Sequence, residues 1–168
     1  MSPISDRIFE NLGPNKEIAL EFLVTFSRFE HALKYSGLCK DMNDGARAKA
    51  DWGKYISELS RDAKAKIEVE ANKFLLGQPP KIQIMKQGKV SWQPADRDNR
   101  DIIVWIFDLI NIVRNNLFHG GKYRESVDSE DHPNSTRDTD LVKACLSILS
   151  ICLKDENTVT TAFYSGLD

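Results

Sequence analysis

Cysteine is scarce in this chain, and the few cysteines present are poorly placed for cross-linking. The chain has three cysteines, an odd number, and no two of them are closely spaced: Cys39, Cys145 and Cys152. This pattern excludes a disulfide framework or a zinc knuckle as the basis of the fold. Cys145 and Cys152 lie seven residues apart, so on a helix they would share one face. We expect both to pack in a hydrophobic core.

The sequence also lacks a long apolar run. No stretch reaches the roughly 20 apolar residues that a membrane-spanning helix requires. The first residues, Met-Ser-Pro-Ile-Ser-Asp, contain neither the basic nor the apolar segment of a secretory signal. We therefore expect no membrane partner and a cytoplasmic location.

An excess of charge of one sign is missing as well. The 168 residues include 23 basic and 25 acidic side chains, which gives a formal net charge of −2. This balance is not typical of a general nucleic-acid binder, and no basic recognition helix of a DNA-binding protein is visible. An RNA substrate would therefore be held by local, salt-sensitive contacts. With 41% apolar residues, we expect a single domain over residues 1–168 with a substantial core.

What the sequence does contain is helical periodicity. Residues 16–37 carry apolar side chains at steps of three and four, which predicts a helix with one buried face. Asn15 is the candidate N-cap of this helix, and Gly37 is its expected stop. A second helical region covers residues 51–76, with an expected break near residue 60.

The remaining segments complete the predicted fold. Apolar and polar residues alternate over residues 81–94, which indicates a small β-hairpin. Residues 122–138 form a polar loop that is long enough to suggest a functional or mobile segment. A further helix is expected over residues 139–154, followed by a short tail helix. The predicted fold class is all-α: a compact bundle of four to six helices, with the hairpin as an insertion.

The most apolar stretch of the chain is residues 102–117. It is apolar on nearly all sides, so it is expected to be a central, buried helix. Asp96, Asp98 and Asn99 are its candidate N-caps. Polar residues on such a helix must face water, a partner or a ligand. Arg114, near its end, is therefore a candidate functional residue.

Three side chains at the end of this helix fit the chemistry of RNA cleavage without a metal or a cofactor. That reaction moves a proton from the ribose 2′-hydroxyl, supplies one to the leaving 5′-oxygen, and stabilises the charge on the phosphate. His119 suits the proton transfers, because the pKa of histidine lies near neutrality. Arg114 suits the charge, because its planar guanidinium binds two phosphate oxygens. Asn115 could position the ribose or the phosphate, or orient His119.

The spacing of these residues bears on the assembly. Arg114 and His119 are five residues apart, so on an ideal helix they point about 140° away from each other. Gly120 and Gly121 favour a helix that ends at His119, which would free the imidazole to turn. A two-fold dimer along this helix would also pair Arg114 of one protomer with His119 of the other. The simpler alternative is that both side chains cap the last carbonyls of the helix.

Two charged residues on the first helix are candidates to support this site. Arg28 and Glu30 are two residues apart, so they do not face each other as a helix ion pair. One of them could support Arg114 and His119. The alternative is that both are solvated charges on an exposed helix face.

The segment Arg114-Asn115-Asn116-Leu117-Phe118-His119 resembles the Arg-polar-x-x-x-His signature of the HEPN superfamily (higher eukaryotes and prokaryotes nucleotide-binding). The resemblance implies a metal-independent endoribonuclease that acts as a homodimer and leaves a 2′,3′-cyclic phosphate and a 5′-hydroxyl. It also implies a toxin–antitoxin or phage-defence setting, with a possible antitoxin or defence-system partner. Asn116, within the motif, is a further supporting candidate.

The match departs from the family pattern after the histidine. Some family toxins have a tyrosine two residues later, whereas this chain has Gly121 there and its nearest tyrosine is Tyr123. Some family members bind RNA or partner proteins without cutting. A non-catalytic RNA-binding or dimerisation module is therefore the alternative function.

Overall fold

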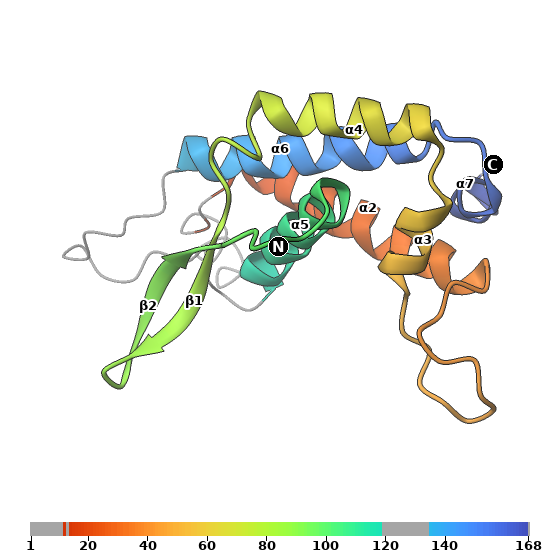
Figure 1. The fold of residues 1–168 in the computed structure, drawn as a ribbon, viewed down its shortest axis with the longest axis horizontal. Coiled ribbons are helices and arrows are strands. Elements are labelled where there is room, and N and C mark those ends of the chain that lie inside the picture. Colours follow the sequence, from red (N-terminus) through yellow and green to blue (C-terminus); the bar gives the residue numbers. More distant parts are fainter. Residues whose placement is uncertain (1–11, 13, 119–134, 168) are drawn as a thin grey trace.

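The computed structural model describes residues 12, 14–118 and 135–167. Helices dominate these residues, and a single two-stranded hairpin interrupts them in the chain order (Figure 1). The elements are α2 (Lys16–Tyr35), α3 (Trp52–Glu58), α4 (Arg61–Lys73), β1 (Lys81–Lys86), β2 (Lys89–Pro94), α5 (Ile102–Phe118), α6 (Ser135–Cys152) and α7 (Thr158–Tyr164). The predicted all-α fold class with a small hairpin is confirmed.

Helix α2 begins and ends where its sequence predicts. The side chain of Asn15 accepts a hydrogen bond from the backbone N–H of Ile18 at 3.2 Å, as an N-cap does. At the other end, the N–H of Leu38 donates to the carbonyl of Leu33 at 2.9 Å, which closes a Schellman motif. Gly37 supplies the positive φ of 75° that this motif requires.

The expected break in the second helical region is also confirmed. The side chain of Ser60 caps α4 by accepting from the N–H of Ala63 at 3.1 Å. The backbone N–H of Ser60 donates to a carboxylate oxygen of Asp155 at 3.0 Å. This bond ties the start of α4 to the segment that follows α6.

The cap of α5 was predicted at the wrong residue. Asp101, and not Asp96, Asp98 or Asn99, accepts from the N–H groups at the start of the helix, at 2.9 Å from Ile103 and 3.2 Å from Val104. Asp101 immediately precedes the first helical residue, so its short side chain reaches these groups. The earlier candidates lie in a loop held by other contacts.

Helix α6 begins earlier than predicted. Its first turn contains residues 135–138, which the sequence assigned to a polar loop; residues 122–134 lie outside the described ranges. The guanidinium of Arg137 donates to the carbonyls of Gln78 and Pro79, at 3.3 Å and 2.8 Å. Asp138 is only 3% exposed. These contacts with distant residues stabilise a polar turn that its own sequence does not favour as a helix.

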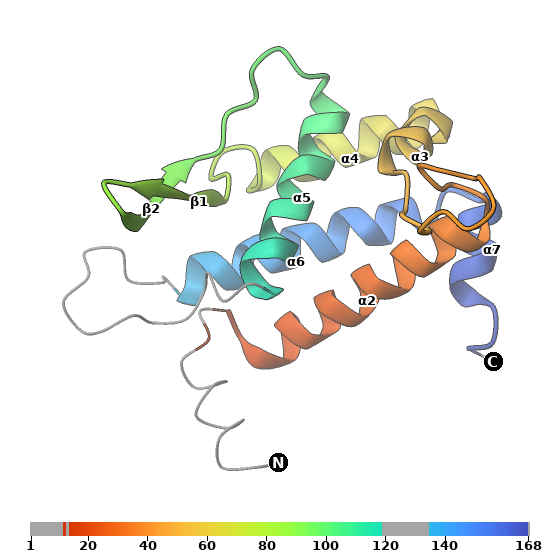
Figure 2. The same cartoon turned by 90° about the horizontal axis from the view of Figure 1, so that it is seen from below.

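Helices α2, α6 and α4 lie side by side, with α6 in the middle, and α5 crosses them (Figures 1 and 2). The N–H of Asn15 donates to Oγ1 of Thr139 at 2.9 Å, so α2 and α6 start at the same end of the layer. Helix α7 packs on α2, and α3 packs on α5. No helix within the described ranges is both long and apolar enough to cross a membrane.

The core is a single cluster of buried residues in which aromatic rings fill the space between α2, α3, α5 and α7. Phe29 is fully buried, and its ring centroid lies 5.4 Å from that of Trp52. The ring of Trp52 also lies 5.6 Å from that of Phe107 on α5. Cys145 and Cys152 are buried in the same core, which confirms their predicted packing role.

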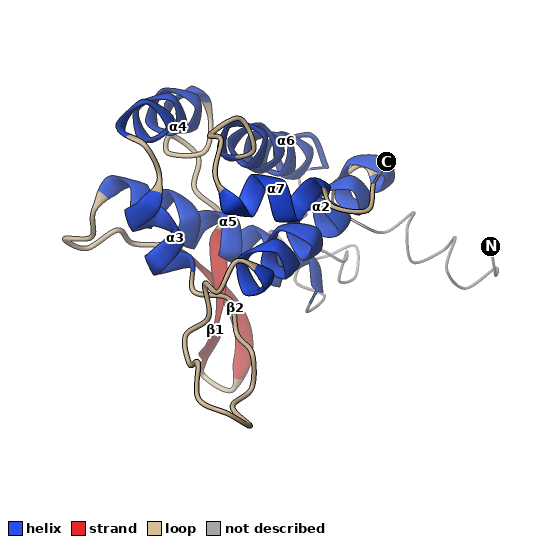
Figure 3. Cartoon of the chain, turned by 90° about the vertical axis from the view of Figure 1, so that its right-hand side faces the viewer, coloured by secondary structure: helices blue, strands red, loops and turns tan. Residues whose placement is uncertain are grey.

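The hairpin projects away from the helices, as Figure 3 shows from the side. Gln87 and Gly88 at its turn both have positive φ, 52° and 75°, as a two-residue type I′ turn requires. Its base is attached to the end of α5, because Nδ2 of Asn116 donates to the carbonyl of Lys81 at 2.9 Å. The hairpin therefore starts beside the last turn of α5.

Candidate functional site

Arg114 lies in the last turns of α5, with its guanidinium against two aromatic rings. The guanidinium carbon is 4.5 Å from the ring centroid of Phe118 and 5.8 Å from that of Phe26 on α2. One terminal nitrogen, Nη1, donates to Oδ1 of Asn115 at 2.9 Å. The Nε atom is buried and has no hydrogen-bond partner among the described residues. The side chain is thus oriented by rings and an amide, and no carboxylate of the described part of the chain neutralises it.

This arrangement differs from that of the other half-buried arginines that the structure describes. Arg28 donates to the carbonyls of Phe163, at 2.9 Å, and Ser165. Arg137 donates to two carbonyls and lies 3.8 Å from the carboxylate of Asp138. Arg114 has neither a backbone carbonyl nor a carboxylate as partner within the described part of the chain. A partly desolvated cation without a counter-charge is a natural site for an anion.

The two asparagines that follow Arg114 have different surroundings. Asn115 is exposed, and its side-chain oxygen holds Arg114. Asn116 is 7% exposed, and its amide is bound to the first residue of the hairpin. The structure therefore brings Asn115 together with Arg114, whereas Asn116 anchors the hairpin. The two side chains leave the helix in different directions, and the supporting role predicted for Asn116 stays a prediction.

The two supporting candidates on α2 also separate. Arg28 is bound to the C-terminal end of α7, so its guanidinium holds that helix in place and is not available to Arg114. Glu30 is half-buried, and its side chain makes no hydrogen bond or ion pair with any described residue. It lies four residues after Phe26, the residue under Arg114, so the two share a face of α2. Glu30 thus remains a candidate.

His119 and Tyr123 lie outside the described residues, as do Gly120 and Gly121. The predicted pairing of Arg114 with His119 therefore stays a prediction. What the structure adds is the position of Phe118, the residue just before His119, which is 56% exposed at the end of α5. The described part of the motif, residues 114–118, thus forms the C-terminal end of α5, with an exposed ring at its last residue.

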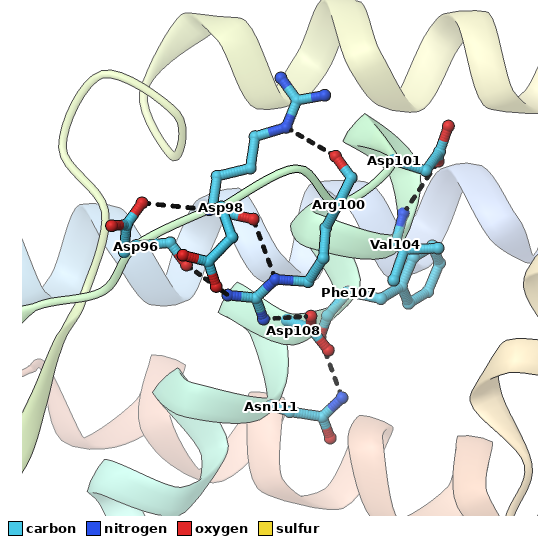
Figure 4. A network of polar contacts seen from close by, with 9 residues as sticks. Asp96, Asp98, Arg100, Asp101, Val104, Phe107, Asp108 and Asn111 are labelled. Carbon is cyan, nitrogen blue, oxygen red and sulfur yellow. Dashed lines mark hydrogen bonds and ion pairs between the residues drawn. The ribbon is translucent and has the colours of Figure 1, made fainter.

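A second polar cluster lies at the opposite end of α5, where Arg100 binds the preceding loop to the helix (Figure 4). Its Nη1 donates to a carboxylate oxygen of Asp108 at 2.9 Å, and its Nε donates to the carbonyl of Arg97 at 3.0 Å. Its other terminal nitrogen donates to the carbonyl of Asp96 and lies 3.5 Å from Asp98. Carboxylates and carbonyls thus saturate Arg100, which indicates a structural role.

The buried thiols and Tyr55 are structural as well. Burial raises the pKa of Cys152 from its ordinary value of 9.0 to about 12. Burial also raises the pKa of Cys145 and that of Tyr55. These groups stay protonated at neutral pH, so they are not activated nucleophiles.

These raised pKa values predict alkaline destabilisation. The unfolded chain releases the thiol protons near pH 9, whereas the folded chain retains them. The stabilisation is therefore fully present below pH 9 and is lost progressively as the pH rises toward 12. We expect the urea midpoint to fall between pH 8.5 and about pH 10.5. Cys145→Ala should be less stable at pH 8.5 but lose less on alkalinisation; an equal loss in both proteins would contradict this account.

Two open cavities lie elsewhere, around the C-terminal end of α6. One, of about 490 Å³, is lined by residues that include Val69 and Ile151, and the other, of about 550 Å³, includes Glu21 and Ser147. Arg114 lines neither cavity. Among the described residues, no group of three His, Cys, Asp or Glu side chains is placed to hold a metal ion.

Comparisons with protein-family models, with curated proteins and with solved structures found no match to this chain.

Proposed function

We propose that the protein is a metal-independent endoribonuclease of the HEPN type. The observation that carries the proposal is the state of Arg114: partly buried, oriented by Asn115 and Phe118, and without a carboxylate or carbonyl partner among the described residues. The resemblance of residues 114–119 to the Arg-polar-x-x-x-His signature supports the same site. The proposed setting is the cytoplasm, in a toxin–antitoxin or phage-defence system.

The proposed mechanism gives each side chain one task. Arg114 binds the scissile phosphate and stabilises the negative charge that develops as the ribose 2′-hydroxyl attacks. His119 accepts the proton of the 2′-hydroxyl or donates one to the leaving 5′-oxygen. Asn115 keeps the guanidinium in place through its 2.9 Å bond to Nη1.

A homodimer is part of this proposal. Along a continuous helix, Arg114 and His119 would diverge by about 140°, so one copy of α5 does not aim both at one phosphorus atom. A two-fold axis beside the end of α5 would bring Arg114 of one protomer to His119 of its partner. The exposed ring of Phe118 at this position would then face the same cleft.

The test is incubation of the purified protein with RNA in excess EDTA. We expect cleavage, with products that end in a 2′,3′-cyclic phosphate and a 5′-hydroxyl. His119→Ala should lower the rate by about 100-fold or more while the circular dichroism spectrum is retained. His31→Ala is the matched control, because His31 stacks on Tyr35 with ring centroids 4.3 Å apart, toward the end of α2. Undiminished cleavage by His119→Ala would refute the assignment, and RNA binding without turnover would favour a non-catalytic module.

A further inference from the structure

The hairpin is the most basic element of the described chain. Between Gly77 and Ala95 there are three lysines and no acidic residue, in a protein whose net charge is −2. The rest of the chain therefore carries a net charge of −5. The hairpin, which projects from the helices (Figure 1), thus has a net charge of +3 and opposes the net negative charge of the other residues.

Two of these lysines face each other at the tip. Lys86 and Lys89 are Cα partners across β1 and β2, on either side of the Gln87–Gly88 turn. Both are exposed, and neither side chain forms a hydrogen bond or an ion pair with a residue that the structure describes. Like charges placed directly opposite each other destabilise a two-stranded hairpin. This pair therefore works against the fold, and a bound anion would relieve its repulsion.

The arm is attached near the end of the helix that carries Arg114. Asn116, two residues after Arg114, holds the carbonyl of Lys81 at 2.9 Å, and because residues two apart on a helix do not face each other, this attachment lies on a different face of α5 from Arg114. At about 3.4 Å per residue, the five steps along β1 place Lys86 roughly 17 Å from this attachment. The lysine pair lies too far away to touch the phosphate at Arg114, but within reach of a phosphate several nucleotides along the same strand.

We infer that the hairpin tip is a phosphate-binding site for the flanking strand of the RNA that Arg114 binds. Lys86 and Lys89 would contact the backbone without reading the bases, so this contact raises affinity without specifying sequence. The inference rests on the proposed function, because the strand is the substrate of the Arg114 site. It assigns the hairpin to substrate binding, and chemistry at the scissile bond stays with Arg114 and His119.

The test compares two double variants of equal charge. One is Lys86→Gln/Lys89→Gln at the tip. The control is Lys40→Gln/Lys49→Gln, whose residues are also exposed and are joined by a bond of 2.9 Å from the N–H of Lys40 to the carbonyl of Lys49. Each double substitution is introduced into the wild-type protein to measure RNA cleavage, and into His119→Ala to measure RNA binding without cleavage. The RNA probes are a single-stranded 20-mer and a trinucleotide.

For the 20-mer, the tip variant should reduce the slope of log affinity against log salt by about 1.4, since each lost phosphate contact on a single strand accounts for about 0.7. Between 50 and 200 mM salt, wild type should then lose about sevenfold more affinity than the variant. KM for the 20-mer should rise with kcat unchanged, and trinucleotide cleavage should be unaffected. The melting temperature should stay the same or rise, since the lysine repulsion is removed.

An unchanged salt slope in the tip variant would overturn the inference but would not affect the proposed nuclease activity. The lysines would then be candidates to bind an acidic protein partner. Equal losses in the control variant would also overturn it, because the effect would come from net charge. If RNA binding depends on the hairpin tip but wild type does not cleave RNA, the proposed nuclease activity is refuted and the proposed role of the tip stands. If wild type does not bind RNA, both proposals are refuted.

Discussion

Arg114→Ala is expected to lower the rate of RNA cleavage by about 100-fold or more, because the variant loses the charge that stabilises the transition state. Arg114→Lys should recover part of this loss, since an ammonium keeps the charge without the two-pronged geometry of a guanidinium. The measurement is the initial cleavage rate in EDTA at saturating RNA. The free energy of unfolding should change little. The stacking that is lost on Phe26 and Phe118 is offset by removal of a buried Nε that has no hydrogen-bond partner among the described residues.

Arg28→Ala is the contrasting variant. Its guanidinium holds two carbonyls at the end of α7, so this change should lower stability and leave cleavage by the folded protein intact.

Arg114→Ala mixed in equal amount with His119→Ala also tests the dimer. Half of the dimers would be mixed and would contain one intact site each, so about a quarter of wild-type activity should return. Full activity in Arg114→Ala would refute the assignment, and no recovery on mixing would refute a site shared between protomers.

The local features of the fold could be predicted because they depend on neighbouring residues. The cap at Asn15, the stop at Gly37 and the hairpin turn at Gln87–Gly88 are each determined by a few neighbouring residues. The prediction failed where distant residues decide. The first turn of α6 is stabilised by bonds from Arg137 to carbonyls 58 and 59 residues away. Such a long-range contact cannot be predicted from the local pattern of polar residues.

The candidate site shows the same division. The sequence identified Arg114 as an unusual polar residue on an apolar helix, with Asn115 as a candidate beside it and Asn116 as a supporting candidate. The sequence does not show what Asn116 contacts, and the structure adds its bond over 35 residues to Lys81 of the hairpin. The Phe26 ring beside Arg114 comes from a helix 88 residues earlier in the chain. The lack of a described carboxylate partner at Arg114, which carries the functional proposal, is likewise a property of the assembled fold.

The positions of Arg28 and Arg114 also show why residue type alone was insufficient. Both are half-buried arginines near the aromatic core, yet Arg28 donates to two backbone carbonyls, whereas Arg114 has no described carbonyl partner. A guanidinium that is tied to backbone carbonyls of another helix stabilises the fold. A guanidinium with donors to spare can exchange solvent for a ligand. The distinction depends on where α7 ends, which the sequence does not specify.

Phe29→Ala should destabilise the protein far more than either arginine variant. The side chain is fully buried, and its ring lies 5.4 Å from both Trp52 and Tyr55 on α3 and 6.0 Å from Phe163 on α7. Removal of such a ring typically costs about 3–5 kcal/mol, a large part of the roughly 5–15 kcal/mol that stabilises a domain. For a chain of this length we expect the melting temperature to fall by roughly 6–20 °C, measured by calorimetry.

Val24→Ala is the matched control, since Val24 lies on the same helix but is 69% exposed. Its unfolding free energy should stay within about 0.5 kcal/mol of wild type. A loss below about 1 kcal/mol in Phe29→Ala would show that the aromatic cluster is not the centre of the core. Because Phe26, and not Phe29, supports Arg114, Phe29→Ala should still cleave RNA well below its melting temperature. Retained cleavage would show that the contribution of Phe29 is to stability and not to the Arg114 site.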